Sequence, residues 1–206
     1  MERIAKIRKK GTYFLATMLD GRIEKLHTLS VFDHGLSSGR EFTEFNWDTI
    51  KQESDFHFAW DSAMRMLSIR AHSNGDLSKK LRAKGFAKSA VDDVLENCHR
   101  LELIDDAKFA EMYVSELRAG GAGTRLIKMK LRAKGISEVL SKKELEEKSS
   151  VDDELKAAKV ALKKKEKALA RETDPRKKRE KLYRHLASKG FNFDVISQLC
   201  GDRDFD

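Results

Sequence analysis

The chain has 206 residues, of which 37% are charged and 40% hydrophobic, enough for one domain or two small ones. Its formal net charge of +8 indicates an anionic partner such as nucleic acid, unless the charge is spread evenly over the surface. Two cysteines, Cys98 and Cys200, cannot build a disulfide framework or a metal site alone, and no apolar stretch reaches the roughly 18 residues of a membrane span. Together with the lack of a signal peptide, this predicts a cytoplasmic protein without metal or cofactor.

Residues 1–46 differ in pattern from the rest of the chain and predict a small β-hairpin module. Tyr13–Leu19 is aromatic and β-branched enough for a strand, and Asp20-Gly21 after it is a strong hairpin signal. Residues 22–26 are expected to return antiparallel, and residues 4–8 to add a third strand. Such a module is too small to hold much core alone, so we expect it to dock on the next segment of the chain.

From about residue 54 the chain is predicted to be helical and is organised around one repeated motif. The motif occurs at residues 81–86, 131–136 and 186–191. Each copy starts with a leucine, preceded four residues earlier by another apolar side chain, and ends with Lys-Gly and an apolar residue. Lys followed by Gly is typical of a helix end, because the cation complements the dipole and glycine adopts the left-handed conformation. The repeated leucines are Leu81, Leu131 and Leu186, and the glycines are Gly85, Gly135 and Gly190.

Apolar residues at helical spacing around these motifs predict three tandem three-helix repeats, at residues 54–103, 104–149 and 150–204. Ser73 is the predicted N-cap of the second helix in the first repeat, and Asp105 or its neighbour opens the second repeat. One such unit cannot bury its apolar face alone. The sequence therefore predicts a mostly α-helical protein whose stacked repeats form an elongated, curved solenoid, with the β module at its N-terminus.

Positive charge is concentrated on the second helix of every repeat. Residues 78–84 and 125–134 contain only basic charged residues, and residues 176–189 hold seven basic residues and one acidic one. The summed charge of these three segments exceeds the net charge of the whole chain, so the remainder of the chain is net acidic. They predict a basic stripe that meets an anionic surface, with these candidate binding residues: Lys79, Lys80, Arg82, Arg125, Lys128, Lys130, Arg132, Arg184 and His185.

Two roles that need no partner also stay open for these segments. The lysines of the three Lys-Gly pairs compensate helix dipoles. The remaining cations could form an ordinary solvated face. Capping does not account for the position shared by Lys80, Lys130 and His185, or for the one shared by Arg82 and Arg132.

No arrangement of residues predicts catalysis. The glycines at 120–123 precede a helix but follow no strand, and they favour a flexible joint between helices over a phosphate-binding turn. Paired aspartates occur near predicted helix starts, where capping accounts for them. Cys98 lies on an apolar stripe, and adjacent residues such as Cys98 and His99 point about 100° apart on a helix. We therefore expect a protein that is not an enzyme.

Taken together, the repeated motifs resemble the RecX family, the regulatory proteins that bind filaments of the RecA recombinase. The first repeat carries the spaced pattern Leu67, Arg70, Ser73, Asp76, Leu77, Lys80, Leu81, Lys84, Gly85 and Phe86. The join to the second repeat reads Leu103-Ile104-Asp105-Asp106-Ala107-Lys108-Phe109-Ala110, followed by Tyr113-Val114. The later Lys-Gly motifs resemble the family's later repeats, and the Asp20-Gly21 hairpin and residues 35–39 resemble a β extension that some members carry.

Three departures from the family pattern stand out. Gly75 lies where a better helix former is usual, Thr124 stands where a proline is common, and Lys130 replaces a common glutamate. The resemblance implies a non-enzymatic regulator that inhibits RecA ATP hydrolysis, strand exchange and repressor self-cleavage. It thereby implies a role in recombinational DNA repair and the SOS response, with the basic stripe as the candidate surface for RecA or DNA. We also expect weak binding to DNA, and a monomer, because no long heptad seam indicates an obligate dimer.

The competing hypothesis is a basic helical-repeat protein that binds nucleic acid without RecA, since three-helix units with a basic second helix imitate helix-turn-helix. Few aromatic residues lie on the basic helices, which disfavours a dedicated single-strand binder there. Groove binding, end capping and protomer sequestration all stay open as modes of RecA inhibition. So do the contacting face, the role of the β module and the oligomeric state.

Overall fold

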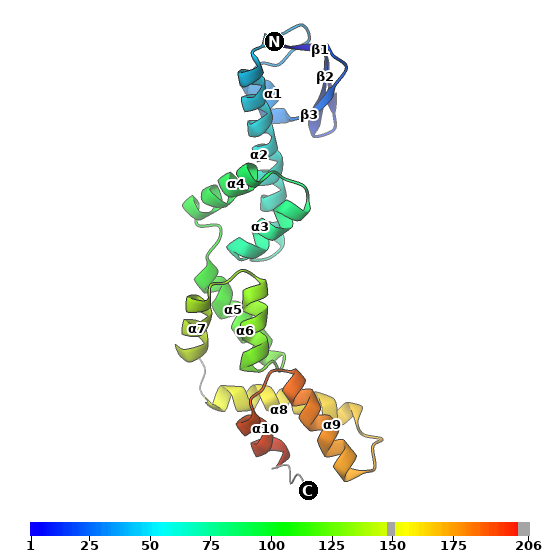
Figure 1. The fold of residues 1–206 in the computed structure, drawn as a ribbon, viewed down its shortest axis with the longest axis vertical. Helices are drawn as coiled ribbons and strands as arrows, with labels where there is room; N and C mark the ends of the chain where they lie inside the picture. The colour runs from blue at the N-terminus through cyan, green and yellow to red at the C-terminus, as the bar shows by residue number, and fades with distance from the viewer. Residues whose placement is uncertain (148–150, 202–206) are drawn as a thin grey trace. The chain divides into compact units, whose positions relative to one another are not determined.

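The computed structural model describes residues 1–147 and 151–201 (Figure 1). These residues form four strands and ten helices, and the prediction of a mostly helical protein with a small N-terminal sheet is confirmed. The predicted boundary at 149/150 and the predicted end at 204 lie outside the described residues. The elements are β1 (Glu2–Lys10), β2 (Tyr13–Met18), β3 (Ile23–His27), α1 (Thr28–Asp33), β4 (Glu41–Phe42), α2 (Glu44–Ile69), α3 (Asn74–Ala83), α4 (Lys88–Arg100), α5 (Asp106–Ala119), α6 (Thr124–Ala133), α7 (Glu138–Glu147), α8 (Val151–Ala168), α9 (Pro175–Ser188) and α10 (Phe193–Cys200).

The N-terminal strands form one antiparallel sheet in the order β3-β2-β1-β4. The predicted hairpin at Asp20-Gly21 joins β2 to β3, and Gly21 has a φ of 88°, in the left-handed region. β1 is the predicted third strand. β4 pairs only with Glu2 and Arg3, so the rest of β1 has a strand on one side only.

Helix α2 begins at Glu44, well before the predicted start near residue 54, and the short helix α1 has no counterpart among the predicted elements. The Thr43 hydroxyl accepts a hydrogen bond of 3.2 Å from the Asn46 N–H and caps α2. Trp47 and Ile50 then pack into the core of the sheet, as expected for a module that docks on the adjoining segment. The second half of the same helix packs against α3 and α4. One helix therefore serves two cores, and the sequence pattern indicates only the second.

The chain divides into two compact units. The first contains residues 1–72 and 77–104, that is, the sheet, α1, α2, α4 and most of α3. The second contains residues 73–76 and the chain from residue 105 onward. The second unit holds two helical cores, one shared by α5, α6 and α7 and the other by α8, α9 and α10. With α2, α3 and α4, these helices form three successive three-helix domains.

The second helix of each domain is anchored by buried side chains and ends at glycine. Leu81, Leu131 and Leu186 are completely buried. The glycines that come after them have left-handed backbones, with φ of 91° at Gly85, 77° at Gly135 and 86° at Gly190. At helix starts, side-chain oxygens of Ser73 and Asp105 accept hydrogen bonds of 3.1 Å and 2.9 Å from the N–H groups of Asp76 and Lys108. In the two ranges that the structure describes, no helix is both long enough and apolar enough to cross a membrane.

Candidate basic interaction surface

Helix α6 exposes a row of cations on one face. Arg125, Lys128 and Arg132 have the i, i+3, i+7 spacing of a single helix face, and all three are exposed. Met129 lies beside them and is also exposed. The opposite side of α6 carries Ile127 and Leu131, which are buried in the core of the domain. Burial of this apolar stripe fixes the rotation of α6 and turns the three cations, hereafter the α6 basic face, toward solvent.

The cations of α6 differ in their partners. Lys128 Nζ lies 2.9 Å from Glu138 Oε1 of α7, and the hydrogen bond and charge of Lys128 lower the pKa of Glu138. Arg125 and Arg132 form no ion pair within the described part of the chain. Lys130 is half-buried and lies off the α6 basic face. The structure therefore brings together three of the four α6 residues that the sequence singles out and separates Lys130 from them.

Helix α9 is basic, but acidic neighbours engage several of its cations. Arg184 is exposed and pairs with Glu180 one turn earlier. Lys181 Nζ pairs with Glu172 at 2.5 Å. These exposed ion pairs screen part of the charge on α9. The α6 basic face therefore presents a larger share of uncompensated charge than the corresponding part of α9.

His185 of α9 lines a small hollow on the third domain. The hollow has a volume of about 310 Å³ and is also lined by Lys164, Lys165 and Lys189. Burial, followed by the charges of Lys189 and Lys165, lowers the pKa of His185. His185 is therefore neutral at pH 7 and does not add a positive charge as Lys80 and Lys130 do.

Helix α3 carries the corresponding residues of the first domain. Lys79 and Arg82 are exposed, whereas Lys80 is half-buried. As on α6, the cation directly before the repeated leucine is therefore less accessible than the one directly after it. Lys80 also has an interaction partner, so it is a weaker candidate for binding than Lys79 or Arg82.

In the second unit, α9 and α6 meet end to end. The Gly123 N–H donates a hydrogen bond of 2.8 Å to the Lys189 carbonyl, and the Arg125 N–H donates one of 3.1 Å to the Gly190 carbonyl. The free N–H groups that start α6 thus pair with the free carbonyls that end α9. A Cβ on Gly123 would lie 2.5 Å from the Gly190 carbonyl carbon. Gly123 is therefore a site of close backbone packing, and the prediction of a flexible joint is wrong at this residue, because the backbone of α9 lies against it.

The end of α6 meets the first turn of α3 in a different way. The Ser73 hydroxyl donates a hydrogen bond of 2.6 Å to the Lys134 carbonyl, and Lys134 Nζ lies 2.9 Å from Asp76 Oδ1. A Cβ on Gly75 would lie 2.7 Å from the Gly135 Cα. The departure from the family pattern at Gly75 therefore makes room for a neighbouring backbone. Lys134 stabilises this junction and is not a free surface cation.

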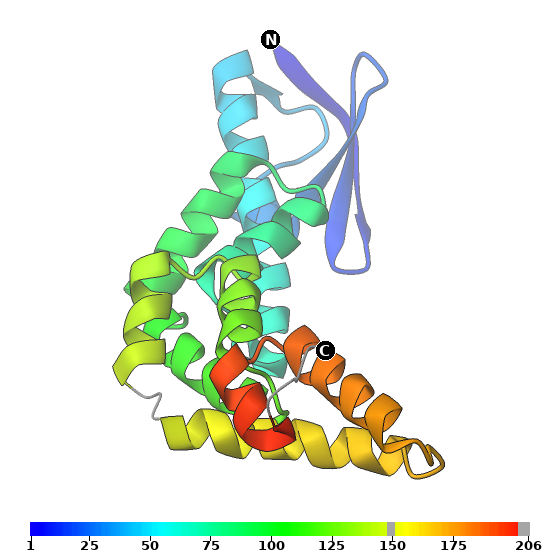
Figure 2. The same ribbon diagram turned by 60° about the horizontal axis from the view of Figure 1, so that its bottom comes forward.

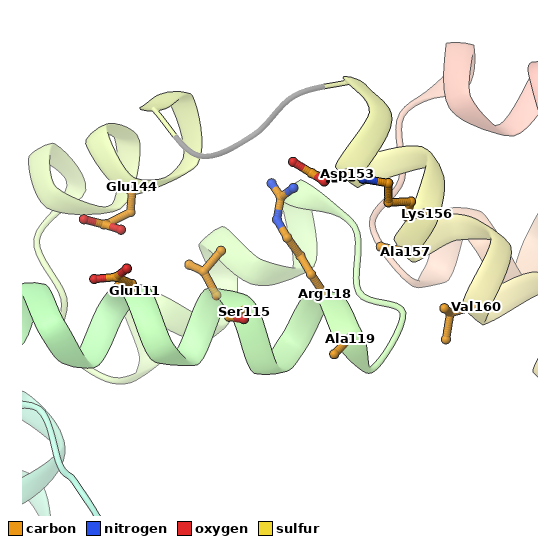
Figure 3. A pocket seen from close by; sticks show the side chains of 10 residues that line it. Glu111, Ser115, Arg118, Ala119, Glu144, Asp153, Lys156, Ala157 and Val160 are labelled. Carbon is orange, nitrogen blue, oxygen red and sulfur yellow. Dashed lines mark hydrogen bonds and ion pairs between the residues drawn. The ribbon is translucent and has the colours of Figure 1, made fainter.

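A larger cavity of about 460 Å³ lies among α5, α7 and α8 (Figure 3). Figure 3 shows Glu111 and Glu144 facing each other near one end, with Arg118 and Asp153 toward the other. Asp153 pairs with Lys156 at 3.2 Å, and the other three have polar or electrostatic partners as well. Charges of both signs line the cavity, so it does not favour a purely anionic ligand. We interpret it as a packing junction between the second and third domains.

These features define a class of helical-repeat protein that consists of successive three-helix domains, each with a basic second helix. Family models match each of the three domains separately. The models described as the first, second and third three-helix domains of RecX match residues 59–98, 105–143 and 152–200.

Proteins that are similar over most of this chain carry the same name. The Regulatory protein RecX of Bacillus licheniformis is 32% identical over 185 residues, which cover 88% of this chain and 68% of the relative. That of Prosthecochloris aestuarii is 33% identical over 151 residues, 73% of this chain and 96% of the relative. The chain belongs to the RecX family.

Solved structures share the fold. A crystal structure of regulatory protein RecX covers 98% of this chain and all of its own, with a TM-score of 0.64 and 23% identity. The crystal structure of RecX from Lactobacillus salivarius covers 70% of this chain and 94% of its own, with a TM-score of 0.57 and 23% identity.

Proposed function

We propose that this protein binds RecA or RecA–DNA filaments and inhibits RecA ATP hydrolysis, strand exchange and co-protease activity without catalysing a reaction. In this role it would modulate recombinational DNA repair and the SOS response. Membership of a family whose relatives are named regulatory proteins supports the proposal. The observation that carries it is the α6 basic face, because its two arginines are exposed and engaged in no ion pair within the described residues.

The physical role of these cations is to meet an acidic protein surface or the phosphates of filament-bound DNA. Charge complementarity raises the rate of association and excludes wrong partners. Contacts to phosphate also release counterions, so binding weakens as salt rises. Arginine suits both kinds of partner, since its planar fork donates two hydrogen bonds to one carboxylate or phosphate.

The test measures ATP hydrolysis by RecA on single-stranded DNA at physiological salt while this protein is titrated in. The informative variant is Arg125→Glu/Arg132→Glu, which reverses two exposed charges and leaves the Lys128–Glu138 pair in place. The control is Lys108→Glu/Lys143→Glu, the same charge change on exposed residues of α5 and α7. We expect the first variant to require at least about tenfold more protein for half-inhibition, with an unchanged helical circular-dichroism signal.

The stoichiometry of inhibition separates the modes. Inhibition well below the RecA concentration indicates capping of filament ends, and inhibition near equimolar protein indicates binding along the filament or to free protomers. Equal loss of inhibition in both variants would show that net charge matters and the α6 basic face does not.

The second candidate function is nucleic-acid binding without RecA, which the basic charge of all three second helices favours. In that case the wild-type protein leaves RecA ATP hydrolysis unchanged and binds bare DNA with a steep dependence on salt. Measuring both quantities in the same buffer distinguishes the two functions.

A further inference from the structure

One face of the N-terminal sheet packs on a core, and along β1 the other face is turned away from it. Side chains opposite each other in an antiparallel pair lie on the same face, and faces alternate along each strand. Ile7 pairs with Ala16, and Phe14 pairs with Leu26; all four belong to the core of the sheet. Figure 2 shows the strands lying to one side of α2. The residues between these positions must therefore point to the other face, hereafter the outer face.

Three cations of β1 occupy alternate positions on the outer face. Lys6, Arg8 and Lys10 pair with Thr17, Leu15 and Tyr13, the outward residues of β2, and all three cations are exposed. Successive members of the row are separated by about 7 Å along the strand. In the part of the chain that the structure describes, none of the three forms an ion pair. This row differs from α9, where carboxylates engage several cations.

The surroundings of the row are basic, apolar and aromatic. Lys25 of β3 pairs with Leu15, and its ammonium lies 4.5 Å from the ring centroids of both Tyr13 and Phe58 of α2. Among β1, β2 and β3, the carboxylates Glu2 and Glu24 pair with core residues and therefore lie on the packed face, away from the row. Lys6, Arg8, Lys10 and Lys25 therefore share the outer face with a half-buried tyrosine and leucine. The carboxylate of Glu41 on β4 pairs with Arg3 at the far end of β1, and at β3 the buried His27 packs this face against Phe58 of α2.

Protection of an exposed strand edge is the competing role for these cations. β1 lacks a partner strand beyond Arg3 on the β4 side, and charged side chains on an edge strand oppose aggregation. Lysine in particular serves that role, so edge protection accounts for the cations of the row. It does not account for the apolar and aromatic side chains that adjoin them.

We propose that the outer face binds single-stranded nucleic acid, with Lys6, Arg8 and Lys10 on successive phosphates and Tyr13 and Leu15 against the bases or sugars. A row of cations beside apolar and aromatic side chains is how sheets bind single strands without sequence preference. A regular linear spacing of charge fits the repeating phosphates of an extended strand better than the scattered carboxylates of an acidic protein. The site is separate from the α6 basic face and does not depend on RecA.

The test measures binding of the full-length protein to fluorescent oligothymidylate by anisotropy, without RecA, over a series of salt concentrations. Lys6→Glu/Arg8→Glu/Lys10→Glu keeps the edge strand charged and reverses the attraction. We expect it to weaken binding at least about tenfold and to reduce the salt slope by about 2, the value for three lost phosphate contacts on a single strand.

The strand supplies its own matched control. Lys9 pairs with Phe14 and so belongs to the core side of the sheet, although its side chain is exposed. Lys9→Glu carries the same charge change as Arg8→Glu one residue away. We expect Arg8→Glu to weaken oligothymidylate binding about threefold or more. Lys9→Glu should change the affinity by less than about 1.5-fold.

Three results would overturn the proposal. The first is unchanged oligothymidylate affinity in the triple variant, and the second is equal loss in the Arg8 and Lys9 variants. The third is tighter binding of a duplex of the same length, which would make the face a duplex site. Loss of RecA inhibition with full oligonucleotide affinity would instead assign the outer face to a protein partner.

Discussion

Gly85 and Gly190 end equivalent helices of the first and third domains, yet they lie in different surroundings. Both come directly after a lysine, and both have left-handed backbones, with φ of 91° and 86°. A Cβ on Gly85 would meet nothing within 4 Å, whereas a Cβ on Gly190 would lie 2.4 Å from the Leu126 backbone nitrogen. The same sequence motif therefore ends a free helix in one domain and forms a junction between domains in another.

The two junctions of the second unit also differ in what holds them. The α9–α6 junction uses backbone hydrogen bonds between helix ends. The α6–α3 junction uses the Ser73 hydroxyl and the Lys134–Asp76 ion pair. Backbone contacts forbid a side chain at glycine, whereas side-chain contacts depend on which residues are present. Substitutions at the glycines and at Lys134 therefore distinguish the two kinds of junction.

The largest effect is expected from Gly190→Ala compared with Gly85→Ala. The left-handed backbone alone costs an alanine about 1–2 kcal/mol, and this cost applies to both variants. At Gly190, overlap with the backbone of α6 adds about 1–3 kcal/mol. Urea unfolding monitored by circular dichroism measures both losses of stability. Equal losses of stability in the two variants would show that the α9–α6 junction accommodates a methyl group without a measurable loss of packing.

Lys134→Met should have the next largest effect. It removes the ammonium that pairs with Asp76, whose side chain is only 9% exposed. We expect a loss of about 2 kcal/mol, reduced from the value for a fully buried pair because Lys134 itself reaches solvent. Lys84→Met, at the exposed equivalent position of the first domain, should stay within about 0.5 kcal/mol.

A double-mutant cycle with Asp76→Asn isolates the ion pair from any loss of packing. A coupling energy near zero between positions 76 and 134 would contradict the assigned role of Lys134.

Gly75→Ala tests whether helix propensity or packing decides the α6–α3 junction. Alanine is better than glycine inside a helix by about 1 kcal/mol, so propensity alone predicts stabilisation. The structure predicts a net loss of about 1–2 kcal/mol, because the new Cβ would lie 2.7 Å from the Gly135 Cα. The thermal midpoint gives the sign directly, and a higher midpoint would refute close packing at this position.

The smallest effect concerns His185 and the hollow beside α9. Its pKa is lowered below 6.5, the ordinary value, so below pH 6.5 the unfolded chain binds a proton that native His185 resists. Stability should therefore fall as the pH drops from 6.5 toward the native pKa of His185. Imidazole NMR titration measures that pKa, and Lys189→Gln should raise it by removing a neighbouring positive charge. A native pKa above 6.5 would contradict this electrostatic assignment.

Sequence patterns are most informative where the physics is local. The Lys-Gly motifs, the apolar stripes and the Asp20-Gly21 hairpin concern residues a few positions apart, and the structure contains the helices and strands that they predict. The predicted start of α2 is wrong because Trp47 and Ile50 pack on a sheet formed by distant strands. The sequence shows that β1 is rich in cations, but only strand register shows which of them share a face.

The sequence by itself determined the repeated three-helix plan, the concentration of basic residues on second helices and the family resemblance. These depend on spacing, capping and composition along the chain. Only the tertiary structure decided which cations are available, because Lys134 is engaged by Asp76 and Lys130 is half-buried, whereas Arg125 and Arg132 reach solvent. It also decided why Gly75 and Gly123 are glycines. Each of these glycines lies against a backbone about 60 positions away in the sequence, and a local sequence pattern does not predict which distant segments come into contact.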